Sequence, residues 1–168
     1  MISKYATLFL LFLSLSCFSQ ESKIDSLKKL KKTDKFIINN LIAWEFAKTN
    51  PDSLLYYNNI SKKYIKLENQ KGEFHALNSA YYLLIQDFKK SKKEAKKALE
   101  ISLKISDNKI SGSIYNNLST VARFEGDYTE CKKNLDLSLK YRLLTKDNSQ
   151  ISNTYKNYGA YYATINDN

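Results

Sequence analysis

The feature that most constrains the fold is a pattern that recurs after forty residues. The stretch "DNKISGSIYNNLS" occupies residues 107–119, and the similar stretch "DNSQISNTYKNYG" occupies residues 147–159. The same spacing matches apolar residues with apolar ones and turn residues with turn residues, as in Leu99/Leu139, Leu103/Leu143, Asp107/Asp147, Tyr115/Tyr155 and Asn117/Asn157. Fixed periods in this range are typical of stacked arrays, because one helix pair cannot bury its apolar face alone.

Each period predicts two helices. Within residues 110–125, apolar side chains fall at helical spacing, and "EGDY" then interrupts the pattern at Gly126. Within residues 128–144 a second stripe follows in steps of four, at Cys131, Leu135, Leu139 and Leu143. Four glycines and one proline are few helix breakers for 168 residues, so the composition favours an all-α protein.

The pattern resembles the tetratricopeptide repeat (TPR) in a longer, forty-residue form. The family's small eighth residue is matched by Ser119 and Gly159, and its aromatic eleventh residue by Tyr82 and Tyr162, although Ala122 departs. The "G-D-Y" turn stands at residues 126–128, and the small twentieth and twenty-seventh positions are matched by Ser91/Ala98 and Cys131/Ser138. The resemblance implies a right-handed α-α superhelix (solenoid) of about three and a half TPR-like helical hairpins.

The repeat domain is expected over residues 35–168, divided at approximately 35–69, 70–107, 108–147 and a truncated 148–168. Residues 20–34 are expected to form an N-terminal capping helix and linker, in which Ile24, Leu27 and Leu30 pack against the first pair. In residues 150–165, five large side chains are too many for one buried stripe, so some must face outward: Tyr155, Tyr158, Tyr161, Tyr162 and Ile165. This C-terminal helix is therefore expected to contact a second copy, a partner's helix or the remainder of a longer protein.

Residues 1–19 have the features of a secretory signal peptide. Lys4 precedes an apolar stretch that is shorter than the roughly 20 residues a membrane span needs. We expect cleavage after Ser19 and an exported protein, periplasmic or extracellular, without a membrane span. Lipid attachment at Cys17 ranks second, because Ser14 stands where that signal usually has Leu. With Cys17 removed, Cys131 is the remaining thiol, and we interpret it as a small buried side chain.

The charge balance favours an acidic partner. The chain has 27 Lys and Arg against 17 Asp and Glu, a formal net charge of +10. Such a balance can mark nucleic-acid binding, but export argues against it and favours an acidic ligand or an anionic membrane surface. The lysines of residues 89–97 form either a docking strip or a solvated outer face, and the solvated face is the interpretation we favour.

No pattern in the sequence indicates catalysis, a cofactor or a metal. The single histidine, His75, falls at a packing position of the TPR-like pattern, which favours a partly buried structural role. No His and Cys cluster has metal-ligand spacing, and neither a G-x-G-x-x-G nor a P-loop motif occurs. We therefore expect a protein that is not an enzyme and that needs no cofactor.

The TPR resemblance implies that the first helix of each pair lines a concave groove, and there it places six candidate partner-binding residues. Asn117 and Asn157 share one family position, where an amide can clamp an extended peptide backbone. The four flanking candidates could hold an acidic side chain or a C-terminal carboxylate: Asn116, Thr120, Arg123 and Lys156. In the alternative interpretation, "NNL" only links adjacent helices by hydrogen bonds.

These observations predict an exported TPR-like scaffold that binds a peptide or protein in its groove without catalysis. An alternative follows from "AWEFAKTNPDSLLYY" at residues 43–57, which is similar to the opening of extracytoplasmic repeat regions in bacterial sensor proteins. That resemblance implies the sensor fragment of a signalling protein without its histidine-kinase or DNA-binding output domain.

Overall fold

The computed structural model describes residues 24–29, 34–47 and 49–166, and in these ranges it contains helices and no strand. The predicted all-α class is confirmed. A short helical segment covers residues 24–28. The longer helices are α2 (Lys35–Phe46), α3 (Pro51–Lys62), α4 (Glu68–Leu84), α5 (Phe88–Lys104), α6 (Asn108–Phe124), α7 (Tyr128–Thr145) and α8 (Asn148–Asn166). The signal-peptide prediction, with Cys17, and the packing of Leu30 concern positions outside the described residues.

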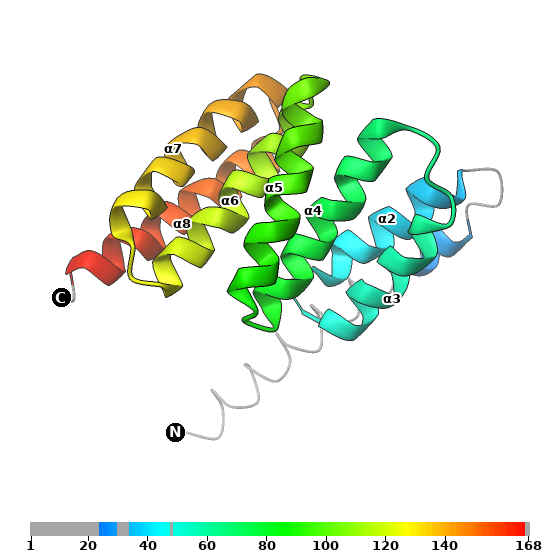
Figure 1. The fold of residues 1–168 in the computed structure, drawn as a ribbon, viewed down its shortest axis with the longest axis horizontal. Coiled ribbons are helices and arrows are strands. Elements are labelled where there is room, and N and C mark those ends of the chain that lie inside the picture. Colours follow the sequence, from blue (N-terminus) through cyan, green and yellow to red (C-terminus); the bar gives the residue numbers. More distant parts are fainter. Residues whose placement is uncertain (1–23, 30–33, 48, 167–168) are drawn as a thin grey trace, which may run out of the picture.

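Consecutive helices form hairpins that follow one another across the molecule (Figure 1). The most extensive contacts join α2 to α3, α4 to α5 and α6 to α7. Helices α2, α4, α6 and α8 also contact one another in succession, so they form one layer, and among the described helices α3, α5 and α7 contact members of this layer but not one another. Helices α4, α6 and α8 begin forty residues apart, as do α5 and α7, so one sequence period corresponds to one hairpin.

The turns between α4 and α8 share one geometry, which recurs every twenty residues. Each has a residue in the left-handed region, with φ between 56° and 77°: Gln86, Ser106, Gly126 and Lys146. The next residue is always an aspartate whose carboxylate accepts the backbone N–H three positions on, at 2.9–3.1 Å: Asp87, Asp107, Asp127 and Asp147. The left-handed residue ends one helix and the aspartate caps the next, so the chain reverses direction within two residues.

Small side chains allow the paired helices to approach closely. Ser79, Ser91 and Ser119 are at most 1% exposed, and the Ser91 hydroxyl donates to the Ser79 carbonyl at 2.9 Å. A Cβ atom added to Gly112 would lie 2.8 Å from Cγ of Arg142 on α7. The prediction that Ser119 is buried in the packing is confirmed, and its hydroxyl donates to the Asn116 carbonyl at 2.7 Å.

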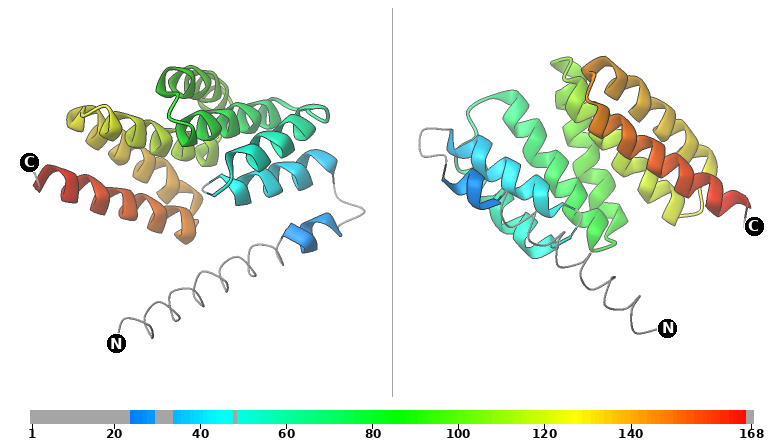
Figure 2. Two further views of the ribbon diagram at one scale, coloured as in Figure 1. Left: turned by 90° about the horizontal axis from the view of Figure 1, so that it is seen from below. Right: turned by 180° about the vertical axis from the view of Figure 1, so that it is seen from behind.

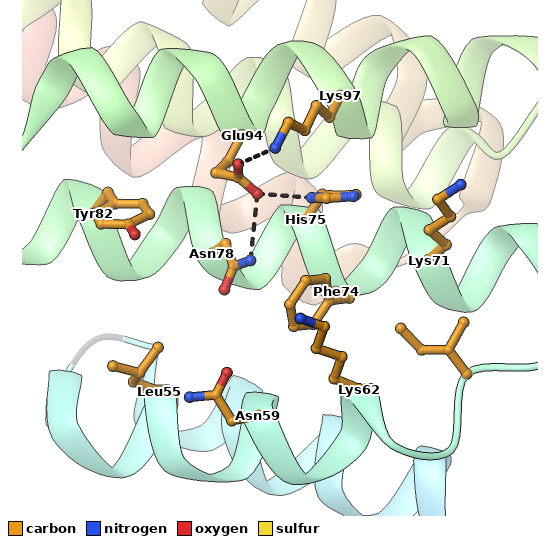
Figure 3. A pocket seen from close by; sticks show the side chains of 11 residues that line it. Leu55, Asn59, Lys62, Lys71, Phe74, His75, Asn78, Tyr82, Glu94 and Lys97 are labelled. Carbon is orange, nitrogen blue, oxygen red and sulfur yellow. Dashed lines mark hydrogen bonds and ion pairs between the residues drawn. The ribbon is translucent and has the colours of Figure 1, made fainter.

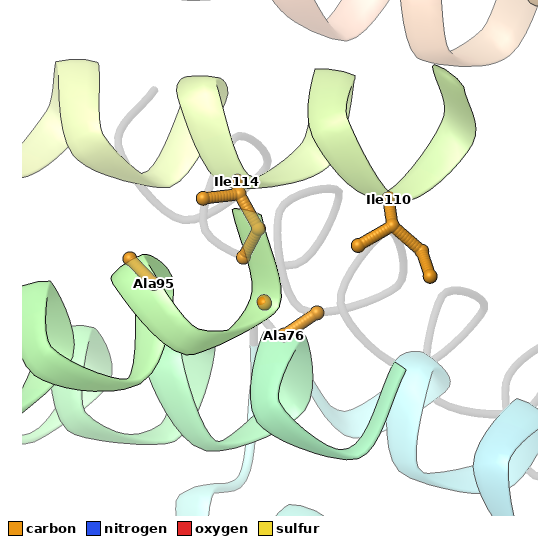
Figure 4. Packing of buried hydrophobic residues seen from close by; sticks show 5 residues of the cluster. Ala76, Ala95, Ile110 and Ile114 are labelled. Carbon is orange, nitrogen blue, oxygen red and sulfur yellow. The ribbon is translucent and has the colours of Figure 1, made fainter. Parts of the chain in front are cut away.

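Three apolar clusters each join one hairpin to the first helix of the next. The central cluster, drawn in Figure 4, brings together Ala76 of α4, Ala95 of α5, and Ile110 and Ile114 of α6. Equivalent clusters lie among α2, α3 and α4 and among α6, α7 and α8. Each hairpin thus completes its core only against its neighbour, as stacking predicts. The thiol of Cys131 is 2% exposed and its pKa is raised by burial, in agreement with a packing role.

The two ends of the array differ in how they cover apolar surface. At the N-terminal end, Ile24 is 6% exposed and Leu27 is half-buried, while their contact with the first helix pair stays a prediction. On α8, Tyr161 is buried, whereas Tyr155 and Tyr162 are 56% and 47% exposed, so the prediction that some of these tyrosines face outward is confirmed.

Within the described ranges no helix combines the length and the hydropathy that a membrane crossing needs.

Candidate functional site

A hollow of about 580 Å³ opens between α3, α4 and α5, and we name it the Glu94 pocket (Figure 3). Its lining includes the lysines Lys62, Lys71 and Lys97, the aromatic ring of Phe74 and the carboxylate of Glu94. Its volume falls within the range of about 300–1,000 Å³ that is common for ligand sites. The pocket therefore offers charged, amide and aromatic groups in a space large enough to hold a small ligand or a peptide side chain.

The carboxylate of Glu94 organises the floor of this pocket. Its Oε1 accepts from Nζ of Lys97 at 2.6 Å, and its Oε2 lies 2.7 Å from Nδ1 of His75 and 3.3 Å from Nδ2 of Asn78. The Glu94 and His75 side chains are 11% and 15% exposed. Burial disfavours the ionised form, but the hydrogen bonds from Lys97, His75 and Asn78 lower the pKa of Glu94 below its ordinary value. Glu94 is therefore an anion at neutral pH that fixes three donors.

The helical spacing explains how these groups meet. On α5, Glu94 belongs to the buried stripe formed by Ser91, Glu94, Ala95, Ala98 and Ser102, so it points inward from an otherwise lysine-rich helix. His75 and Asn78 are one turn apart on α4, and both face Glu94 (Figure 3). Asn58 of α3 extends the network, because its Nδ2 donates to Oδ1 of Asn78 at 2.8 Å and to the Phe74 carbonyl at 3.1 Å.

The lining of the pocket carries excess positive charge. Three lysines face one glutamate, so the lysine charges of the lining outnumber its carboxylate charges by two. Lys97 is held by Glu94, whereas Nζ of Lys62 lies 5.5 Å from the centre of the Phe74 ring. Lys71 has only a 4.0 Å contact with Glu68, and both of these side chains are more than half exposed. Lys62 and Lys71 are therefore placed to bind a carboxylate ligand.

The His75–Glu94 pair has the geometry of a base and the carboxylate that orients it, but the pocket lining contains no serine, threonine or cysteine that such a pair could activate. Nor does the described part of the chain gather three or more metal-ligating side chains. The lysines of the pocket lining are suited to holding an anionic ligand in place.

The six groove candidates named from the sequence lie on α6 and α8. Asn116 is buried, and its Oδ1 accepts from Nδ2 of Asn157 at 2.8 Å and from Nη1 of Arg142 at 3.4 Å. The amides of Asn116 and Asn157 thus join α6 to α8, which is the link that the alternative interpretation of "NNL" expected. A role of these two residues in binding a partner stays a prediction.

The remaining groove candidates have different surroundings. The Thr120 hydroxyl donates to the Asn116 carbonyl at 3.1 Å, and the Arg123 guanidinium lies 4.8 Å from the centre of the Phe124 ring. Nδ2 of Asn117 is buried and makes no hydrogen bond within the described structure, while Lys156 is exposed. Of the six, Arg123 and Lys156 are the cations that can reach a ligand on this surface.

Sequence reasoning missed Arg142, which is 3% exposed at the junction of α6, α7 and α8. Its Nη1 donates to Oγ1 of Thr154 at 2.7 Å and to the Gln150 carbonyl at 2.8 Å. Burial lowers the pKa of Arg142 to about 10. A signal was present, because Arg142 lies forty residues after Ser102, on the inner stripe of its helix.

No protein-family model, curated protein or solved structure matches the chain. The functional argument therefore depends on the chemistry of the Glu94 pocket and of the surface formed by α6 and α8.

Proposed function

We propose that the protein is an exported TPR-like scaffold that binds an acidic peptide or protein segment without catalysis. In this proposal the hairpins form a right-handed superhelix of about three and a half repeats. The observation that carries the binding function is the Glu94 pocket, a hollow with two surplus positive charges on a floor fixed by hydrogen bonds. The forty-residue period and the stacked clusters support the scaffold.

The chemistry of the pocket selects a carboxylate-bearing ligand. Ammonium groups of Lys62 and Lys71 provide charge-assisted donors, each worth roughly 1.5–3 kcal/mol when it meets an anion with water excluded. The Phe74 ring offers an apolar surface beside them, which suits the methylene groups of a glutamate side chain. Because Glu94 already neutralises Lys97, the ligand's carboxylate is directed toward the other two lysines.

The TPR resemblance implies a second surface for the same ligand, the groove that carries Arg123 and Lys156. Charge-reversal variants of the chain from residue 20 onward can show which of these two sites binds the ligand. The probe is a fluorescent glutamate-rich peptide, and the readout is fluorescence anisotropy. If the Glu94 pocket is the site, Lys62→Glu and Lys71→Glu each weaken binding by about tenfold or more, equivalent to about 1.4 kcal/mol. Lys156→Glu then has little effect.

The matched control is Lys133→Glu on α7, where the side chain is 66% exposed and is not part of the pocket lining. All of these variants change the net charge by the same amount, so they lower non-specific attraction equally. A loss of binding confined to Lys156→Glu and an Arg123→Glu variant would place the site in the groove instead. Equal losses in all variants, control included, would reduce the interaction to general charge attraction and overturn the proposal.

A further inference from the structure

The outer face of α8 carries a regular stripe of exposed residues: Ser152, Tyr155, Gly159, Tyr162 and Ala163, with Lys156 beside them. Small residues alternate with tyrosines along this stripe, and a Cβ atom added to Gly159 would meet nothing within 4 Å. Figure 2 shows α8 at the outer edge of the array, and among the described helices it contacts α7 and α6.

The same face of α6 binds a second helix. The residues forty positions before Ser152, Tyr155, Gly159 and Tyr162 are Gly112, Tyr115, Ser119 and Ala122, and these four lie within the α6/α7 hairpin. Gly112 is in close contact with Arg142, Tyr115 stacks on Tyr141 at 5.6 Å, and Ala122 packs with Cys131. Helix α8 therefore presents, exposed, the surface that α6 uses to hold α7.

We propose that a second copy of this chain covers the outer face, with the two α8 helices packed antiparallel about a two-fold axis at Gly159. Antiparallel pairing about Gly159 brings Tyr155 opposite the partner's Ala163, so a large side chain meets a small one. It also brings Lys156 opposite the partner's Tyr162, where an ammonium group can lie over the ring. Each pairing occurs twice, as an isologous interface requires.

A pair of small residues in an existing hairpin supports this choice of occupant. Where α4 meets α5, both helices contribute a small residue, Ser79 and Ser91, whose hydroxyl oxygens are 3.3 Å apart. On α8 the equivalent of Ser79 is Gly159, and in a pair of α8 helices each copy contributes its own Gly159. Helix α8 has Lys156 as its one charged residue, so the face offers little to a strongly acidic or basic partner. A neutral, tyrosine-rich surface matches its own copy best.

The test is sedimentation of the chain from residue 20 onward across a wide concentration range. We expect a reversible monomer–dimer equilibrium, which Gly159→Arg abolishes. The same variant should melt at the same temperature or higher as a monomer, because a Cβ atom at residue 159 meets nothing within 4 Å and glycine is a poor helix former. If the dimer is lost while helical content and melting temperature are retained, the substitution has disrupted the interface and not the fold.

A second variant pair controls for exposed aromatic surface. Replacing Tyr155 and Tyr162 together by lysine should weaken the dimer by about tenfold or more, because buried tyrosines commonly dominate interfaces. The control is Tyr56→Lys on α3, where the tyrosine is 62% exposed, and it should leave the association unchanged. A strict monomer at every concentration, or a dimer that survives Gly159→Arg, would overturn the proposal.

Salt distinguishes this association from ligand binding. Without Lys4, the chain from residue 20 onward has a formal net charge of +9, one less than the +10 of the full sequence, so two copies repel each other and added salt should strengthen the dimer. Binding of an acidic peptide in the Glu94 pocket should weaken under the same conditions. Failure of one proposal therefore leaves the other measurable.

Discussion

The left-handed turn residues give a prediction whose magnitude follows from backbone geometry alone. Gln86 has φ of 59° and Gly126, at the equivalent point forty residues later, has φ of 77°. A residue with a Cβ atom pays roughly 1–2 kcal/mol in this conformation, and glycine does not. Against this gain, glycine loses roughly 0.5–1 kcal/mol more conformational entropy on folding. We therefore expect Gln86→Gly to stabilise the protein by about 0.5–1 kcal/mol.

The reverse change should act in the opposite direction. Gly126→Ala adds a Cβ atom that meets nothing within 4 Å, so its effect reports the backbone conformation without a steric clash. We expect a destabilisation of about 1 kcal/mol. Urea unfolding followed by circular dichroism measures both changes, and in thermal melts each kcal/mol corresponds to about 2–4 °C for a chain of this size.

Gln86→Ala is the matched control, because it removes the same exposed side chain but keeps a Cβ atom at positive φ. It should not reproduce the gain from glycine. If Gln86→Ala stabilises as much as Gln86→Gly, or if Gly126→Ala leaves stability unchanged, then turn geometry does not explain the energetics. Ser106→Gly, at φ of 56°, should add its own gain, since the turns at residues 86 and 106 are separate.

Three further predictions concern buried positions. Ser119→Leu should overpack a site that is 1% exposed and cost about 1–3 kcal/mol, whereas Ser149→Leu, at an exposed position, should change little; equal effects would mean that the repeat register is wrong. Arg142→Met should cost about 2 kcal/mol in urea unfolding, because Thr154 loses its donor; a gain would show that burying the charge outweighs its hydrogen bonds. The lowered pKa of Glu94 contributes stability that is present above the ordinary carboxyl pKa of about 4.3 and is lost as pH falls through the lower folded value. The test compares the free energy of unfolding at neutral pH with that below pH of about 4. Between these conditions the Glu94→Gln protein should lose less of this free energy than the unsubstituted protein, and an identical loss would contradict this assignment.

The sequence alone determined the helices, because the signals for them are local. The two apolar stripes within residues 110–125 and 128–144 predicted α6 and α7, and both helices begin and end within two residues of the expected limits. An aspartate at every twentieth position from 87 to 147 was also visible and marks every helix start in that range. Such signals depend on hydrogen bonds within a few residues, so no knowledge of the tertiary arrangement is needed to find them.

Only the tertiary structure decided which polar side chains meet. The inner stripe of α5 shows that Glu94 points inward, but not that it reaches His75 and, through Asn78, the amide of Asn58. Asn116 was expected at a groove surface, and it is buried because α8 packs across α6 and Asn157 reaches its side-chain oxygen. These contacts join residues 16 to 41 positions apart on helices whose relative rotation is set by small-residue packing. A slight change in that rotation turns a buried amide outward, and helical periodicity alone does not encode it.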